Sequence, residues 1–345
     1  SDEFVAALAH TRSALERVHL DEAGRRTVRG IKLRAQAFGL DLVALDLREE
    51  SRAHTEAVDE LFKAACLRDD YARLRPDERE ALLSAELRTA RPLRPVGYKP
   101  QTRALDVALG ALDVWRSRGA YVVSMTHTPA DLLEVLVLAR EVGLYTPNVG
   151  VPFDVVPLFE TLADLEAAPK VVRTLLENPI FLAQVRGRGG FEIMIGYSDS
   201  NKDAGFLAAN WALHRAQEAI TAEAARFGVP VWFFHGRGTS TARGGGSAGR
   251  AIASLPARTV GRRLRITEQG EALADRYSHG ELARRHLEQL VYHLGRAAAR
   301  DEANDVAPLD PAWRSALDDA ARVSTEAYRS LFAMPGFFEF YEQFT

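Results

Sequence analysis

One segment of this 345-residue chain combines glycine and arginine in a way that suits anion binding: FFHGRGTSTARGGGSAGR, residues 233–250. It holds six glycines and three arginines and follows directly on bulky apolar side chains. Glycines let backbone N–H groups approach a ligand closely, and arginine forks match the oxygens of phosphate or carboxylate. The candidate substrate-binding residues here are Arg237, Arg243, Gly244 and Gly245.

Two other interpretations of this segment stay open. It fits a surface loop, or an arginine-glycine segment that contacts RNA nonspecifically. From Arg237 to Arg265 the chain has seven arginines and no acid, so the local charge is positive. The segment has neither the Gly-Lys-Ser/Thr of a Walker loop nor the glycine spacing of a dinucleotide fingerprint. Its position after an apolar run, shared with other reactive groups, favours an anion site.

Two acids and two further polar residues also follow apolar runs. Glu160 and Asp199 offer hard oxygen ligands that could hold one Mg²⁺ or Mn²⁺ and leave positions open for substrate oxygens, although carboxylates after strands also cap helices. Lys202 could act as a point charge, because it is one of only five lysines beside 39 arginines. His235 could donate a hydrogen bond or carry a proton, or could be structural.

The elements that must position these groups are six short apolar runs, whose length and β-branched or aromatic content predict strands. They are residues 40–47, 120–125, 153–160, 191–198, 229–235 and 262–268. Helical patterns alternate with them, which indicates a parallel sheet in an α/β fold, open or closed. Because reactive groups follow four of the runs, starting with Arg48, a partial TIM-like (β/α) barrel with many additional helices is favoured.

Helix signals lie between these runs. Thr128 predicts an N-cap, with Pro129 at the first helical position. Thr161 and Asp164 resemble a capping box. Residues 203–227 have helical composition up to Gly228. We expect a single domain with a helical N-terminal part (1–39), a barrel core (40–275) and a helical C-terminal part (276–345).

The overall composition excludes several classes of protein. A net charge of −3 with 47% hydrophobic and 26% charged residues argues against a surface devoted to nucleic acid or anionic lipid. No apolar run reaches 18 residues, and the single cysteine cannot form an internal disulfide. We therefore expect a soluble, cytoplasmic protein. The chain has no initiator methionine and ends in LFAMPGFFEFYEQFT, so we expect it to be part of something longer.

Five segments together resemble phosphoenolpyruvate carboxylase, in that family's order and over residues 40 to about 275. They are LDLREESRAHTEAV, VPLFETLADLEAA, MIGYSDSNKDAGFLAANWALHRAQEA, FFHGRGTSTARGGGSAG and RLRITEQGEAL. The resemblance implies an α/β barrel with many extra helices, Mg²⁺ or Mn²⁺ but no biotin, and a homo-oligomer, a tetramer in the family. Neither nucleic acid nor membrane is an expected partner.

The resemblance also implies a reaction and residue roles. Bicarbonate attacks the phosphate of phosphoenolpyruvate to give carboxyphosphate and the enolate of pyruvate, and carboxylation of the enolate yields oxaloacetate. Glu160 and Asp199 match the family's metal ligands, which hold substrate and enolate oxygens. The family's phosphate- and bicarbonate-side arginines are matched by Arg48, Arg237 and Arg243. Lys202 and His235 lie in its active-site motifs.

The chain departs from the family in three respects. Its glycine segment has Thr239, Ala242 and Ser247 where the family has two glycines and a proline, which restricts the backbone and alters the loop's exit. The family's Thr-Ala-His-Pro-Thr motif, which carries its catalytic histidine, is absent, and so is the long downstream portion. We therefore expect the central part of such an enzyme, inactive alone. The alternative is a noncatalytic divergent fragment that binds metal or anion and assembles with a complementary chain.

Overall fold

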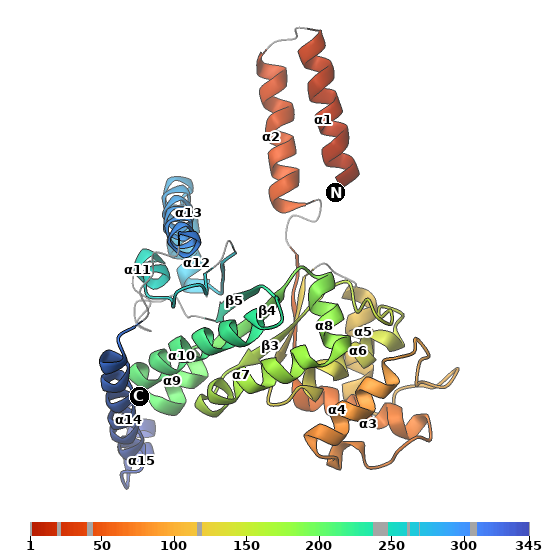
Figure 1. The fold of residues 1–345 in the computed structure, drawn as a ribbon, viewed down its shortest axis with the longest axis vertical. Helices are drawn as coiled ribbons and strands as arrows, with labels where there is room; N and C mark the ends of the chain where they lie inside the picture. The colour runs from red at the N-terminus through yellow and green to blue at the C-terminus, as the bar shows by residue number, and fades with distance from the viewer. Residues whose placement is uncertain are drawn as a thin grey trace. The chain divides into compact units, whose positions relative to one another are not determined.

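The computed structural model describes residues 2–18, 22–39, 44–115, 119–236, 248–260, 263–268, 270–303 and 309–344. These residues form two compact units. The first contains helices α1 (Asp2–Arg17) and α2 (Glu22–Phe38), which lie side by side (Figure 1). The second contains the described strands and the other helices.

The second unit is built on a parallel sheet whose strands follow the order of the chain. Its described strands are β1 (Leu47–Glu50), β2 (Ala120–Ser124), β3 (Asp154–Phe159), β4 (Phe191–Gly196), β5 (Val231–Gly236) and β6 (Arg265–Ile266). Each strand pairs in parallel with the next, in the order β1-β2-β3-β4-β5-β6. This is the order of successive strands in a (β/α) barrel, so the predicted α/β class and partial barrel are confirmed.

Helices connect and cover these strands. They are α3 (Ser51–Ala64), the 3-10 helix η1 (Tyr71–Arg73), α4 (Pro76–Glu86), α5 (Arg103–Trp115), α6 (Ala130–Glu141), α7 (Leu162–Glu177), α8 (Pro179–Gly187), α9 (Ser198–Ala204), α10 (Phe206–Ala225), α11 (Ala248–Ala253), α12 (Gly270–Tyr277), α13 (Gly280–Glu302), α14 (Pro311–Phe332) and α15 (Phe337–Phe344). Helices α3, α6, α7 and α10 contact the sheet, and α7 lies beside α10 (Figure 1). None of the described helices is long and apolar enough to cross a membrane.

The strands present their side chains alternately to two hydrophobic clusters. The larger cluster lies between sheet and helices and includes Phe159, Ile195 and Phe233. The smaller cluster lies on the opposite side, which is the interior side of a barrel. Its members are Ala120, Val122, Val156, Leu158 and Met194, with Phe234 packed against them. Buried on both sides, β2 and β4 are held by packing as well as by their ladders.

The prediction of the first strand was wrong. Residues 44–46 of the apolar run 40–47 are not in a strand, and residues 40–43 lie outside the described part of the chain. Strand β1 instead spans Leu47–Glu50, so its sequence is mostly charged. Its register with β2 pairs Leu47 with Tyr121 and Arg48 with Val122. The partner strand therefore fixes the position of β1, and its burial alternates between half-buried and exposed residues.

Two of the predicted helix boundaries also require correction. The capping box of Thr161 and Asp164 is confirmed at α7. Thr128, in contrast, does not cap α6, which begins after Pro129. The Thr128 hydroxyl is buried without a hydrogen-bond partner, and the Asp131 carboxylate turns back to accept hydrogen bonds from the N–H groups of His127 and Thr128, which precede the helix. The helix predicted at 203–227 is interrupted at Gly205, whose φ of 78° separates α9 from α10.

One buried histidine links α3 to the sheet. His54 is fully buried, and its Nε2 lies 2.9 Å from the hydroxyl of Tyr121 on β2. Burial lowers the pKa of His54 from 6.5 to about 4, because the protonated ring would lose its hydration without gaining an anionic partner. The folded chain therefore holds this ring neutral at pH values where an unfolded chain would protonate it.

This difference makes the fold sensitive to acid. As the pH falls from 6.5 to 4, the unfolded chain protonates His54 and the folded chain does not. The free energy of unfolding therefore falls over this range, by about 3 kcal/mol in total, and is unaffected by His54 above pH 6.5. In urea unfolding measured between pH 7 and 4.5, His54→Gln should lose less stability on acidification than the unsubstituted chain. The matched control is His10→Gln in α1, an exposed histidine, which should follow the unsubstituted chain. Equal acid sensitivity of His54→Gln and the unsubstituted chain would contradict this account.

Candidate active site

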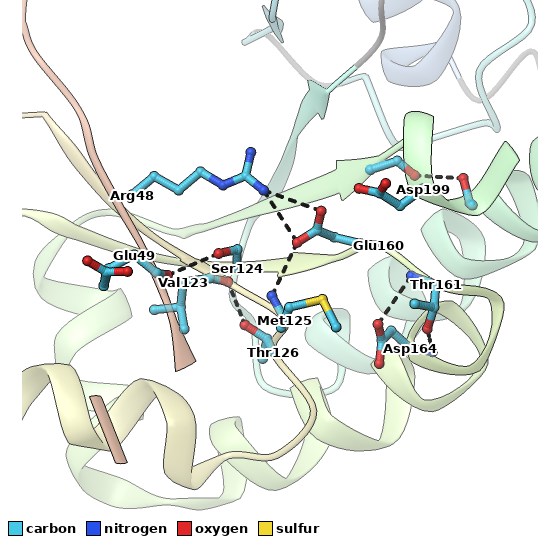
Figure 2. Close-up of polar contacts among 12 residues, drawn as sticks. Arg48, Glu49, Val123, Ser124, Met125, Thr126, Glu160, Thr161, Asp164 and Asp199 are labelled. Carbon is cyan, nitrogen blue, oxygen red and sulfur yellow. Dashed lines mark hydrogen bonds and ion pairs between the residues drawn. The ribbon is translucent and has the colours of Figure 1, made fainter. Parts of the chain in front are cut away.

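Two carboxyl groups meet where β3 and β4 end. Glu160 follows β3 directly, and Asp199 is the second residue of α9, which begins two residues after β4. Because the carboxyl ends of parallel strands lie at one edge of a sheet, residues 39 positions apart become neighbours. Their side chains are close enough for each to shift the pKa of the other. Figure 2 shows both on the same side of the strand ends as Arg48. The structure thus brings together the two acids that the sequence predicted as metal ligands.

Glu160 is held by a side-chain cation and by a backbone donor. Arg48, on β1, places its Nη2 3.3 Å from Oε2 and 3.5 Å from Oε1 of Glu160. The backbone N–H of Met125, directly after β2, donates to Oε1 at 3.2 Å (Figure 2). Glu160 is only 5% exposed, whereas the Arg48 side chain is 54% exposed. The carboxylate is therefore fixed in place, while the guanidinium extends to solvent and can contact an incoming anion.

Burial and proximity separate the proton affinities of the two acids. Burial raises the pKa of Glu160, and the hydrogen bond with Asp199 raises it further, although the Met125 N–H and the Arg48 charge oppose the shift. For Asp199, burial also acts to raise the pKa, but hydrogen bonds from Glu160 and Lys202 outweigh it and the net shift is downward. On acidification Glu160 therefore takes up a proton before Asp199 does.

Lys202 joins this cluster through Asp199. Its Nζ lies 3.1 Å from Oδ1 of Asp199, one helical turn earlier in α9, and its side chain is 75% exposed. Because both side chains are exposed, this ion pair adds little to the stability of the fold. A mobile ammonium at the rim of the cluster is suited to attracting an anion rather than to fixing the fold.

His235 lies elsewhere. It is buried on β5, and its side chain is on the side of the sheet that carries Phe233, opposite to the smaller cluster. Its Nδ1 lies 3.2 Å from the hydroxyl of Tyr197, the residue that precedes α9. This contact links the end of β5 to the start of the helix that carries Asp199. The structure therefore gives His235 a supporting position, and the predicted proton-carrier role stays a prediction.

The structure does not describe the residues of the glycine and arginine segment that were predicted to bind substrate. These are Arg237, Arg243, Gly244 and Gly245, and the substituted positions Thr239, Ala242 and Ser247 also lie outside the described residues. Strand β5 ends at Gly236, directly before Arg237, and Gly236 is paired with Gly196 at the end of β4. The segment therefore begins at the same edge of the sheet as the carboxyl pair.

Two features of the site were not found from the sequence. A Cβ atom at Gly196 would lie 3.2 Å from Cα and 3.3 Å from Cγ of Glu160, so glycine is needed for Glu160 to pack against β4. Met125 has a φ of 53°, a left-handed conformation that is uncommon for methionine. Glycine can serve many purposes, and methionine carries no signal for a left-handed turn, so only the tertiary contacts identify both residues.

The arrangement suits a hard divalent cation. Two carboxyl groups from separate strand ends lie beside each other (Figure 2), and carboxylate oxygens are hard ligands that such a cation prefers. Over the described ranges, no group of three or more His, Cys, Asp or Glu residues could hold a metal ion. Glu160 and Asp199 would thus supply two ligands, and water or substrate oxygens the others, as is usual for Mg²⁺. The residues present fit Mg²⁺ or Mn²⁺.

Comparison with known proteins identifies relatives along the entire chain. The family model described as phosphoenolpyruvate carboxylase matches residues 1–345. A phosphoenolpyruvate carboxylase of Thermus sp. (strain 71) is 59% identical over 100% of this chain and 40% of its own length. One of Rhodothermus marinus is 43% identical over 100% of this chain and 39% of its own length. One of Synechococcus sp. (strain WH7803) is 42% identical over 89% and 32%, respectively. The chain thus spans at most about 40% of these curated relatives.

The close contact between Gly196 and Glu160 leads to a prediction. Gly196→Ala should lower the free energy of unfolding by about 1 kcal/mol, because the added methyl group must displace Glu160. Gly110→Ala is the matched control. Gly110 lies within α5 with no heavy atom within 4 Å of an added Cβ, so its replacement should raise stability by about 0.5–1 kcal/mol. Urea unfolding of both variants measures this difference. Equal stabilisation by the two substitutions would show that Glu160 does not pack on Gly196 as described.

Proposed function

This chain belongs to the phosphoenolpyruvate carboxylase family, and from that premise we propose that it carries the metal-binding and part of the substrate-binding apparatus of such an enzyme. The observation that carries the proposal is that Glu160 and Asp199 lie beside each other at the strand ends (Figure 2), with Arg48 paired to Glu160. The reaction would convert phosphoenolpyruvate and bicarbonate into oxaloacetate and phosphate, through carboxyphosphate and the enolate of pyruvate.

The substrates of this reaction require several positive charges at one place. Phosphoenolpyruvate has a phosphate and a carboxylate, bicarbonate is an anion, and negative charge develops on the enolate oxygen. When bound between Glu160 and Asp199, Mg²⁺ or Mn²⁺ would stabilise negative charge on the substrate oxygens. Arg48 extends from the same strand edge and can bind a phosphate or carboxylate oxygen through its free donors. Lys202 adds a mobile positive charge at the rim.

The glycine and arginine segment would complete the anion site. We assign Arg237 and Arg243 to phosphate and bicarbonate recognition, with the backbone of Gly244 and Gly245 approaching the substrate. Support comes from the position of Gly236, which ends β5 next to Gly196 and leads into this segment.

The remaining parts of the proposal follow from the family. We propose Mg²⁺ or Mn²⁺ without biotin, a cytoplasmic location and assembly into a homo-oligomer of the longer protein. The single cysteine, Cys66, is free and exposed, which suits a reducing compartment.

Metal binding is the direct test of this site. Calorimetric titration with Mn²⁺ should show binding to the unsubstituted chain, weakened at least tenfold in Asp199→Asn and in Glu160→Gln, because each loses one of two protein ligands. The matched control is Asp203→Asn in the same helix, whose carboxylate contacts Leu162 N–H and Arg329 instead of Glu160. Binding by Asp199→Asn as tight as that of the unsubstituted chain would refute the proposed metal site.

Turnover is expected to be absent from this chain alone. The family's histidine-containing Thr-Ala-His-Pro-Thr motif is not in the sequence, so a group needed for the chemistry is missing. With phosphoenolpyruvate, bicarbonate and Mn²⁺, the rate of oxaloacetate formation, coupled to its reduction to malate, should equal that of Glu160→Gln. Robust turnover that Glu160→Gln abolishes would contradict this expectation and show that the chain holds a complete catalytic site.

A further inference from the structure

Met125 is held in a backbone conformation that its side chain does not favour. Its φ of 53° lies in the left-handed region, where a residue with a Cβ atom costs of order 1 kcal/mol and persists only when its surroundings enforce it. The residue stands directly after β2, at the strand edge where Glu160 and Asp199 meet. Its N–H donates to the carboxylate of Glu160, and its left-handed φ turns the chain out of the strand direction directly afterwards.

Both peptide groups of Met125 have side-chain partners. Its N–H donates to Oε1 of Glu160 at 3.2 Å, and its carbonyl accepts a hydrogen bond from the Ser51 hydroxyl at 2.7 Å. Ser51 is the first residue of α3 and is only 7% exposed. The turn is fixed again one residue later, because Thr126 donates its N–H to the Leu158 carbonyl at 3.3 Å. Helix α3 and strand β3 therefore hold the turn from two directions.

The backbone donor fixes the orientation of Glu160 better than the neighbouring arginine does. Arg48 contacts both carboxylate oxygens at 3.3 and 3.5 Å, but its side chain is half exposed and flexible. The N–H of Met125 belongs to the backbone between two buried residues, Ser124 and Thr126, and cannot reorient without disrupting the turn. The carboxylate that this N–H holds lies beside Asp199 at the strand ends (Figure 2).

We propose that Ser51 and Met125 act together as positioning residues for Glu160, with the Ser51 hydroxyl holding the Met125 carbonyl so that the Met125 N–H orients the Glu160 carboxylate towards Asp199. This inference rests on the proposed function, because its importance depends on Glu160 being a metal ligand. Neither residue contacts the metal or substrate. Hydrogen-bonding partners of this kind typically change metal affinity 10- to 100-fold.

Removal of the Ser51 hydroxyl is the first experiment. Ser51→Ala should weaken Mn²⁺ binding, measured by calorimetry, about tenfold, and Ser51→Thr should restore it because threonine keeps the hydroxyl. The matched control is Thr259→Val. The Thr259 hydroxyl is also buried and donates to a backbone carbonyl, that of Pro256 at 2.7 Å, but in a segment that contributes nothing to the carboxyl pair. This variant should lose a similar amount of thermal stability and keep its Mn²⁺ affinity.

Hydrogen exchange at the Met125 amide is the second measurement, and it needs no metal. The exchange rate of this amide should rise several-fold in Ser51→Ala and stay unchanged in Thr259→Val, because only the first loosens the turn. Slow exchange and full Mn²⁺ affinity in Ser51→Ala would overturn the positioning role while leaving the metal site intact. Absence of Mn²⁺ binding by the unsubstituted chain would instead refute the proposed function, and the exchange rates would still decide whether Ser51 holds the turn.

Discussion

Two neighbouring carboxyl groups repel each other when both are ionised, and the pair formed by Glu160 and Asp199 places this constraint on the surrounding structure. Without a cation, Arg48, Lys202 and the Met125 N–H stabilise the pair by supplying positive charge or hydrogen bonds. Each compensating group comes from a different element. The pair is therefore a property of the assembled sheet, and a divalent cation would relieve its repulsion directly.

The two sides of the sheet have different roles. Side chains that face the helices pack into the large hydrophobic cluster and fix the positions of the strands. Side chains on the interior side form the smaller hydrophobic cluster, and polar groups follow them at the strand ends. The interior side also carries charge on its shortest strand. Arg265 on β6 donates to Glu192 on β4 at 2.9 Å, and its guanidinium lies 4.4 Å from the centre of the Phe234 ring. These contacts help to hold β6 against the sheet, because a strand of only two residues forms few backbone hydrogen bonds.

Much of the fold could be predicted because hydrophobic runs and helix-capping residues are local signals. Five of the six predicted strands match, and the capping box at Thr161 forms as expected. The errors occur where contacts or backbone angles that the residue pattern does not show decide the structure. Strand β1 is displaced onto charged residues because β2 fixes its register, and Thr128 does not cap α6. Gly205 ends a helix through its left-handed φ, which composition alone does not distinguish from a tolerated helical glycine.

The sequence by itself determined the family, the alternation of strands and helices, and the choice of Glu160 and Asp199 as paired acids, because residue types and their order are recorded in it directly. Only the tertiary structure decided that these acids lie beside each other, that the His235 side chain faces away from the smaller hydrophobic cluster, and that a left-handed Met125 contacts Glu160. The reason is physical. Distances across a parallel sheet depend on strand register and on which side each residue faces, and both are fixed by packing between segments far apart in the chain.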